Sequence, residues 1–171
     1  MIFLVIVIAI LVIFLLVIII NTNNVKGGID GFKKHIESNH IPCKLEKVQK
    51  KPYQFALTLG SNTYAVLFIS IPDHSEIILN SKTTWELRYG AGNTPGKIHP
   101  YKRYLTQVPK FLNSDESLQK IVIFTPAPKK IAMYINECEM KLIKPSDSPY
   151  GITIINDQEY AELFKNLTNN Q

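Results

Sequence analysis

Three predicted strands lie in residues 53–80, which have the sequence YQFALTLGSNTYAVLFISIPDHSEIILN. Apolar and polar side chains alternate from Tyr53 to Leu59, the pattern of a strand with one buried face. A Gly-Ser-Asn turn follows, and then a β-rich apolar run over Thr63–Ile71. A Pro-Asp pair turns the chain again before Glu76–Leu79. We therefore expect an antiparallel meander of three strands.

The rest of the sequence predicts a mixed α/β domain around this meander. Ile121–Phe124 is a continuous apolar run, which is typical of a central strand buried on both faces. Asn156, with a Glu three residues later, is a capping-box pattern at the start of a helix. Shorter patterns predict strands at residues 130–134 and 151–155 and helices at residues 29–38 and 101–112. We expect one mixed sheet with flanking helices.

The amino-terminal residues 1–20 contain no charged or polar side chain, no Gly and no Pro. A helix of this length spans about 30 Å, the thickness of the hydrocarbon core of a bilayer. We predict a single transmembrane helix over residues 1–20, a polar linker over residues 21–28 and one α/β domain over residues 29–171. The alternative is a cleaved secretory signal, but the segment lacks the basic start and the small residues that a signal requires.

Basic residues on one side of the predicted span suggest how it is oriented. Lys26, Lys33 and Lys34 follow the span, and no basic residue precedes it. Because Lys and Arg are retained on the cytoplasmic side, the domain is expected in the cytoplasm at the cell membrane. In that reducing compartment we expect Cys43 and Cys138 to be free thiols, and a disulfide between them is the alternative if the orientation is reversed.

The net charge of +5 is unevenly distributed along the chain. Residues 26–51 carry seven Lys against three acidic residues, and residues 97–141 carry eight Lys or Arg against four. A basic surface can bind nucleic acid or an anionic lipid surface, or it can be an ordinary solvated surface. We expect the basic binding surface at Lys97, Lys102 and Arg103, where tyrosines are interleaved with the basic residues.

Three segments together resemble the nuclease-related domain family of the restriction-endonuclease-like superfamily. They are Tyr64–Lys82, Pro100–Leu112 and Ile121–Thr125. The similar features are the meander, a Lys near the end of its third strand, a helix that opens after a Pro, and a strand that ends in Phe-Thr. The resemblance implies a restriction-endonuclease-like fold. In that family an Asp on the second strand and a Glu-x-Lys at the end of the third hold a divalent metal and activate water.

The chain departs from the family pattern at the metal-binding acids. Lys82 matches the Lys of the motif, but Asn80 stands where the family has Glu, and Thr63–Ile71 contains no Asp. An amide brings no charge to a divalent cation, which prefers carboxylate oxygens. We therefore expect no catalytic residue, no metal and no cofactor at this degenerate motif. The leading hypothesis is a membrane-anchored, non-catalytic domain that binds nucleic acid or a partner protein.

Two other functions remain open from the sequence. The first is an active metal-dependent nuclease whose carboxylates come from elsewhere, with Asp73, Glu76 and Glu86 as candidates. The second is a structural membrane protein with no ligand.

Overall fold

Two parallel strands form the centre of the fold in the computed structural model. They are β3 (Asn62–Ser70) and β7 (Gln119–Thr125), and β7 also pairs in parallel with β10 (Ile152–Asn156) on its other edge. Every side chain from Ile121 to Phe124 is 0% exposed, so the predicted central strand is confirmed. The structure describes residues 2–89, 97–99, 104–114, 117–136 and 139–169.

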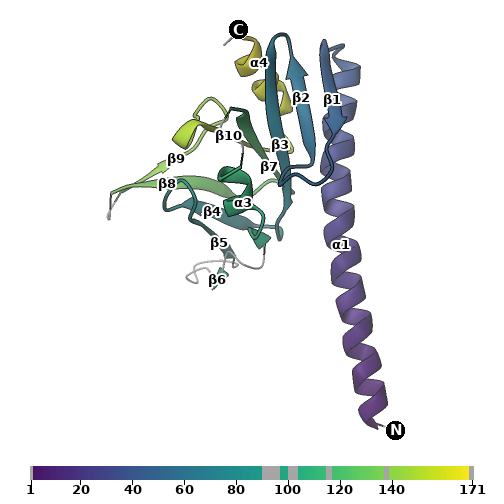
Figure 1. The fold of residues 1–171 in the computed structure, drawn as a ribbon. Helices are drawn as coiled ribbons and strands as arrows, with labels where there is room; N and C mark the ends of the chain where they lie inside the picture. The colour runs from purple at the N-terminus through teal and green to yellow at the C-terminus, as the bar shows by residue number, and fades with distance from the viewer. Residues whose placement is uncertain (1, 90–96, 100–103, 115–116, 137–138, 170–171) are drawn as a thin grey trace.

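The first sheet is completed by an antiparallel pair at one edge. It has the order β1-β2-β3-β7-β10, with β1 at Cys43–Lys47 and β2 at Phe55–Leu59 (Figure 1). Leu59 pairs with Asn62, so a two-residue turn joins β2 to β3, and Gly60 there adopts a φ of 58°. Positive φ is the requirement of a tight hairpin turn, which Gly meets without a steric penalty. The hairpin predicted between these two strands is confirmed.

The third strand of the predicted meander belongs to a different sheet. β4 (Ser75–Leu79) does not pair with β3 but with β5 (Trp85–Tyr89) and, in parallel, with β8 (Lys130–Asn136). This second sheet has the order β6-β5-β4-β8-β9, with β6 at Lys97–His99 and β9 at Glu139–Leu142. The prediction of one mixed sheet with a restriction-endonuclease-like arrangement is therefore wrong, and the fold is an α/β domain with two mixed sheets.

β4 lies in the second sheet because the β3–β4 and β7–β8 connections cross from one sheet to the other side by side. The chain passes from β3 to β4 and from β7 to β8 at neighbouring points. There the Ile71 amide donates to the Thr125 carbonyl at 3.1 Å, and the Lys129 amide donates to the Ser75 carbonyl at 2.7 Å. Because both central strands turn together, their parallel pairing continues into the second sheet as β4 and β8.

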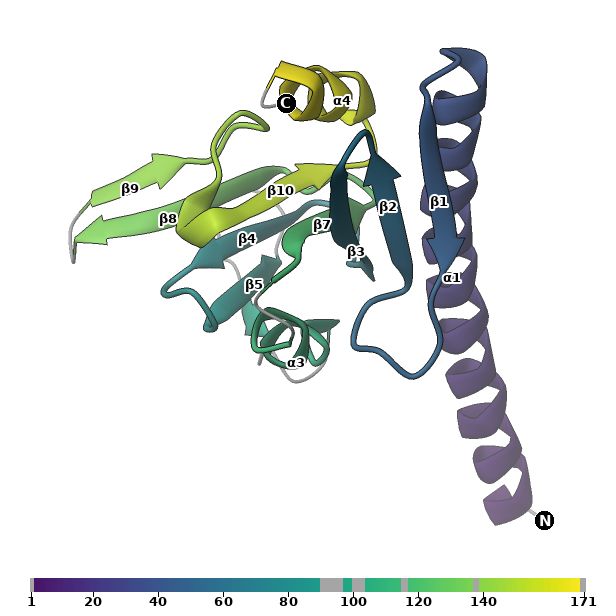
Figure 2. The same ribbon diagram turned by 45° about the horizontal axis from the view of Figure 1, so that its top comes forward.

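One long helix, α1 (Ile2–Ser38), precedes the sheets. Its carboxyl half lies along the first sheet, and its amino half extends away from the sheets (Figures 1 and 2). Within the residues that the structure describes, no helix is both long enough and apolar enough to cross a bilayer. The prediction of a transmembrane helix over residues 1–20 is therefore wrong, and the structure does not test the orientation inferred from it. Residues 21–28, expected to be a linker, are helical, because α1 continues without a break until it packs on the sheet.

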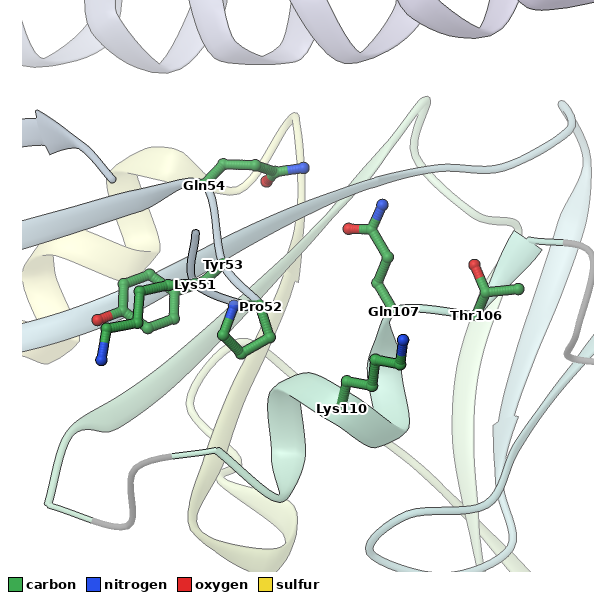
Figure 3. A pocket seen from close by; sticks show the side chains of 7 residues that line it. All are labelled: Lys51, Pro52, Tyr53, Gln54, Thr106, Gln107 and Lys110. Atoms are coloured by element: carbon green, nitrogen blue, oxygen red, sulfur yellow. The ribbon is translucent and has the colours of Figure 1, made fainter. Parts of the chain in front are cut away.

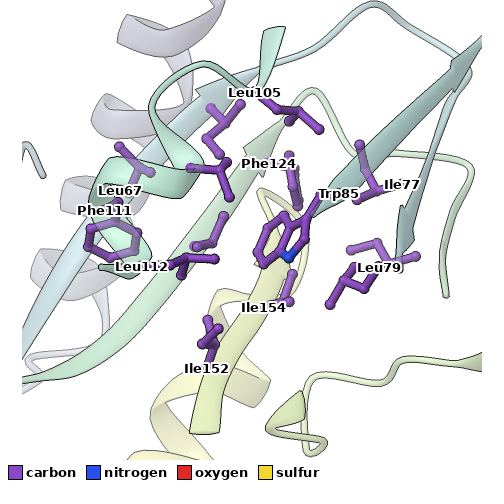
Figure 4. Close-up of a cluster of buried hydrophobic side chains, with 14 of the residues drawn as sticks. Leu67, Ile77, Leu79, Trp85, Leu105, Phe111, Leu112, Phe124, Ile152 and Ile154 are labelled. Atoms are coloured by element: carbon purple, nitrogen blue, oxygen red, sulfur yellow. The ribbon is translucent and has the colours of Figure 1, made fainter. Parts of the chain in front are cut away.

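The first hydrophobic core receives side chains from both sheets and from α3 (Val108–Leu112), as Figure 4 shows. Trp85 and Phe124 meet in it with ring centroids 6.3 Å apart. The helix predicted over residues 101–112 corresponds to the shorter α3. Residues 100–103 lie outside the described part of the chain. Pro109 stands in the first turn of α3, where its missing N–H removes no helical hydrogen bond.

The second core lies between the first sheet, α1 and α4 (Tyr160–Asn169) (Figure 2). Phe32 of α1 is stacked on Phe164 of α4, with ring centroids 5.5 Å apart. Before α4, the Asn156 amide donates to Glu159 Oε2 at 2.9 Å, and Asn156 Oδ1 accepts from the Gln158 amide at 2.9 Å. The bond from the Asn156 amide to Glu159 is one half of the predicted capping box, but the helix does not start at Asn156, because Asn156 ends β10 and α4 begins at Tyr160.

Candidate functional site

A first cavity of about 330 Å³ opens between the β1–β2 connection and the amino end of α3 (Figure 3). Its floor is rigid. The buried Tyr53 ring packs edge-to-face on Phe111, with centroids 6.2 Å apart. The Gln54 side chain accepts from the Phe68 amide at 2.6 Å and donates to the Phe68 carbonyl at 3.0 Å. The lining residues are Lys51, Pro52, Tyr53, Gln54, Thr106, Gln107 and Lys110.

A second cavity of about 280 Å³ lies at the amino ends of β7 and β10. Its lining residues are Lys82, Leu118, Lys120, Tyr150, Gly151 and Ile152. Lys120 is 8% exposed, and its Nζ donates to the carbonyls of Leu112 at 2.9 Å and Ser114 at 2.6 Å. These are carbonyls at the carboxyl end of α3, which a cation stabilises. Lys120 therefore joins the second cavity to the end of α3.

The charge of both cavities is positive. Lys51 and Lys110 line the first, Lys82 and Lys120 line the second, and none of the described lining residues is acidic. Lys51, Lys82 and Lys110 are exposed and form no ion pair with any residue that the structure describes. Cations that are not neutralised by protein carboxylates attract anions, most strongly within a concave surface.

The two residues of the degenerate motif lie in different environments. Asn80 Nδ2 donates to Glu86 Oε1 at 2.5 Å, and Arg88 bonds both to Glu86 Oε2 and to the Tyr134 hydroxyl at 3.1 Å. The hydrogen bond to Tyr134 is the main reason that the pKa of Arg88 is raised. Asn80, at the end of β4, therefore belongs to a polar network with Glu86, Arg88 and Tyr134, whereas Lys82 lines the second cavity.

The three carboxylates considered for an active nuclease do not come together. Glu76 lies 3.5 Å from Lys130 Nζ, Glu86 lies 3.1 Å from Arg88, and Asp73 is exposed beside His74. Across the described part of the chain, no group of three or more His, Cys, Asp or Glu side chains is placed to hold a metal ion. Glu76 and Glu86 are therefore members of ion pairs with Lys130 and Arg88.

Part of the expected basic surface is not described. Lys97 lies in β6, where its backbone is paired with Tyr89, and Lys102 and Arg103 lie outside the described residues. Cys43 is a free thiol, as expected, and burial raises its pKa, while Cys138 lies outside the described residues.

Of the residues that line the two cavities, sequence reasoning named only Lys82 as a site residue. It missed the others, among them Lys51, Lys110, Lys120 and Tyr150. One signal was present for Lys120, because a lysine next to a fully apolar strand run must bury part of its side chain or leave the strand. For the others the sequence held no signal, because the cavities are made by segments far apart in the chain.

The fold and the cavities can be set beside known proteins. The chain matches no family model, no curated protein and no solved structure.

Proposed function

We propose that this protein is a non-catalytic domain that binds nucleic acid through the lysines around α3. The observation that carries the proposal is the charge of the two cavities, whose described lining residues include four lysines and no acid. Three of these lysines, Lys51, Lys82 and Lys110, are exposed and lack an ion-pair partner among the described residues. Phosphate groups of nucleic acid are the repeated anions that such separated cations neutralise.

Two features favour nucleic acid over other anionic partners. The lysines line two concave sites, one at the amino end of α3 and one that Lys120 joins to its carboxyl end. Two such separate sites match the successive anions of one chain better than they match a flat charged surface. An aromatic side chain, Tyr150, lines the second cavity together with Lys82, and sites for single-stranded nucleic acid combine basic side chains with aromatic rings. The resemblance to nuclease-related domains agrees with this proposal and stays a prediction.

The test is a titration of labelled DNA with the full chain, followed by fluorescence anisotropy at several salt concentrations. We expect the logarithm of the binding constant to fall linearly with the logarithm of salt, by about 0.7 for each phosphate neutralised on a single strand. Lys51→Ala, Lys82→Ala and Lys110→Ala should each weaken binding and reduce this slope. The matched control is Lys165→Ala on α4, which removes the same charge from an exposed site across the first sheet.

Three results would overturn the proposal. The first is that no DNA binds at low salt, whether or not anionic lipid vesicles or proteins bind. The second is that Lys165→Ala weakens binding as much as the cavity variants. The third is that the wild-type chain cuts DNA in Mg²⁺ or Mn²⁺ and a chelator stops the cutting. The protein would then be a metal-dependent nuclease and not a non-catalytic domain.

A further inference from the structure

The second cavity contains an aromatic side chain held in an unusual backbone conformation. Tyr150 is the middle residue of a one-turn helix, Pro149–Gly151, and its φ of 57° and ψ of 23° lie in the left-handed region. The turn is closed by a hydrogen bond of 3.0 Å from the Gly151 amide to the Ser148 carbonyl. On either side of it, Pro149 and Ile152 are buried. The turn is therefore anchored at both ends, and Tyr150 is fixed between the anchors.

A tyrosine is an unfavourable choice for this position on backbone grounds. In the left-handed region a Cβ crowds the following carbonyl oxygen, so Gly, Asn and Asp are the residues that usually occur there. Burial does not compensate, because Tyr150 is 40% exposed. Non-glycine residues in this region persist where the surrounding structure fixes them, and they are frequent at ligand sites.

The neighbours of Tyr150 define the chemistry of the cavity. Tyr150 and the exposed Lys82 line the same cavity, so it offers an aromatic ring and a free ammonium group, while the ammonium of the buried Lys120 is bonded to the Leu112 and Ser114 carbonyls. Lys82 is held in place through its backbone, because its carbonyl accepts from Trp85 Nε1 at 3.2 Å. A ligand that fits has a flat ring for the tyrosine and an anion for the lysine. A nucleotide within a strand has both.

We infer that Tyr150 stacks on one unpaired base while Lys82 neutralises an adjacent phosphate, so that this site selects single-stranded nucleic acid. The inference rests on the proposed function and adds the class of strand. Within a duplex both faces of each internal base are covered by its neighbours, so no face of these bases is free for the ring. In a single strand a base can turn out and stack on an aromatic side chain.

The test compares one labelled single-stranded oligonucleotide with its blunt duplex, using the full chain and its Tyr150 variants. We expect Tyr150→Gly to bind the single strand about 5- to 150-fold more weakly, the range found when one stacking ring is lost. Binding to the duplex should be unchanged. Tyr150→Phe should bind both as the wild type does, because it keeps the ring and loses only the hydroxyl.

Tyr150→Gly is chosen because it keeps the fold. Glycine adopts the left-handed conformation freely, so this variant should unfold at or above the wild-type temperature, which circular dichroism measures. The matched control is Leu142→Ala, which truncates another exposed side chain, on β9, and should leave both affinities unchanged.

The outcomes separate this inference from the proposed function. If the wild type binds neither DNA, both fall. If the wild type binds DNA with the expected salt dependence and Tyr150→Gly changes nothing, or weakens single strand and duplex equally, only the stacking inference is overturned.

Discussion

Gly28 of α1 lies against Thr125 at the end of β7, so close that a Cβ added to the glycine would stand 3.0 Å from the threonine side chain. Thr125 cannot easily move away, because it is 3% exposed and its hydroxyl donates to Asp157 Oδ2 at 2.8 Å. This close approach sets how α1 packs on the first sheet. The backbone of α1 can come this close to β7 because Gly28 has no side chain.

We expect Gly28→Ala to destabilise the protein by about 1–3 kcal/mol, the usual cost of inserting a methyl group into a packed interface. Chemical denaturation monitored through Trp85 measures this. The control is Gly27→Ala, one residue earlier, because nothing lies within 4 Å of the Cβ it would add. Alanine favours helix over glycine, so Gly27→Ala should stabilise by about 0.5–1 kcal/mol. Equal effects of the two variants would contradict this account of the contact.

The Tyr160 hydroxyl donates to the Gly28 carbonyl at 2.9 Å, and burial raises the pKa of this tyrosine. In the unfolded chain a tyrosine ionises near pH 10, while in the folded chain Tyr160 stays protonated at that pH. The folded state therefore binds more protons there, and the free energy of unfolding falls as pH rises above about 10. At neutral pH, Tyr160→Phe should cost about 0.5–1.5 kcal/mol through the lost hydrogen bond.

The measurement is urea unfolding of the wild type and Tyr160→Phe at neutral pH and at a pH of about 10.5. The difference between the two proteins should shrink at the higher pH, because the variant has no hydroxyl to ionise on unfolding. A difference that grows with pH would show that the sign of the linkage is wrong.

Local sequence patterns predicted where the strands lie better than they predicted which strands pair. The apolar run at Ile121–Phe124 is buried on both faces, as it should be in a central strand, and β2 and β3 form the predicted hairpin. The placement of β4 failed because its pairing with β8 joins residues about fifty positions apart, and no local pattern encodes such a contact. The pairing of β4 with β8 follows from the adjacent β3–β4 and β7–β8 connections, which pass together from the first sheet to the second.

Tertiary contacts also overrode propensity in α1. The polar residues 21–28 end in two glycines and predict a linker, yet they are helical. The packing of Gly28 on Thr125 and its hydrogen bond from Tyr160 involve residues about 100 to 130 positions away. The first cavity could not be predicted for a similar reason. Lys51 and Lys110 line the same cavity only because the folded chain brings the β1–β2 connection next to α3.

Phe124 of β7 is 0% exposed and faces Trp85 in the core between the sheets. Phe124→Ala should therefore destabilise the protein by about 3–5 kcal/mol, because it removes a large side chain and leaves a cavity. Thermal unfolding followed by circular dichroism measures the loss. Lys165→Ala, on the exposed side of α4, should change the free energy of unfolding by less than about 0.5 kcal/mol. An unchanged melting temperature for Phe124→Ala would mean that β7 is misplaced.

Asn80 and Glu86 give the last prediction, because a hydrogen bond of 2.5 Å joins the amide of one to the carboxylate of the other. Asn80→Asp keeps the shape of the side chain but replaces the donor nitrogen by a carboxylate oxygen. The fold then holds two acceptors in contact, and we expect a loss of about 1–3 kcal/mol at neutral pH. Lowering the pH should reduce this loss, because a proton on either carboxyl group restores a donor between the two oxygens. The folded variant thus binds that proton more tightly than the unfolded chain, and its stability relative to wild type falls as pH rises.

A second substitution tests whether the contact itself is responsible. Glu86→Gln in the Asn80→Asp background returns an amide and a carboxylate to the pair with their positions exchanged, and Arg88 remains within reach of an acceptor. The double variant should recover much of the stability at neutral pH, and a double-mutant cycle from urea unfolding gives the coupling between the two sites. If the effects of the two substitutions simply add, Asn80 and Glu86 do not interact, and the polar network on β4 and β5 has been assigned wrongly.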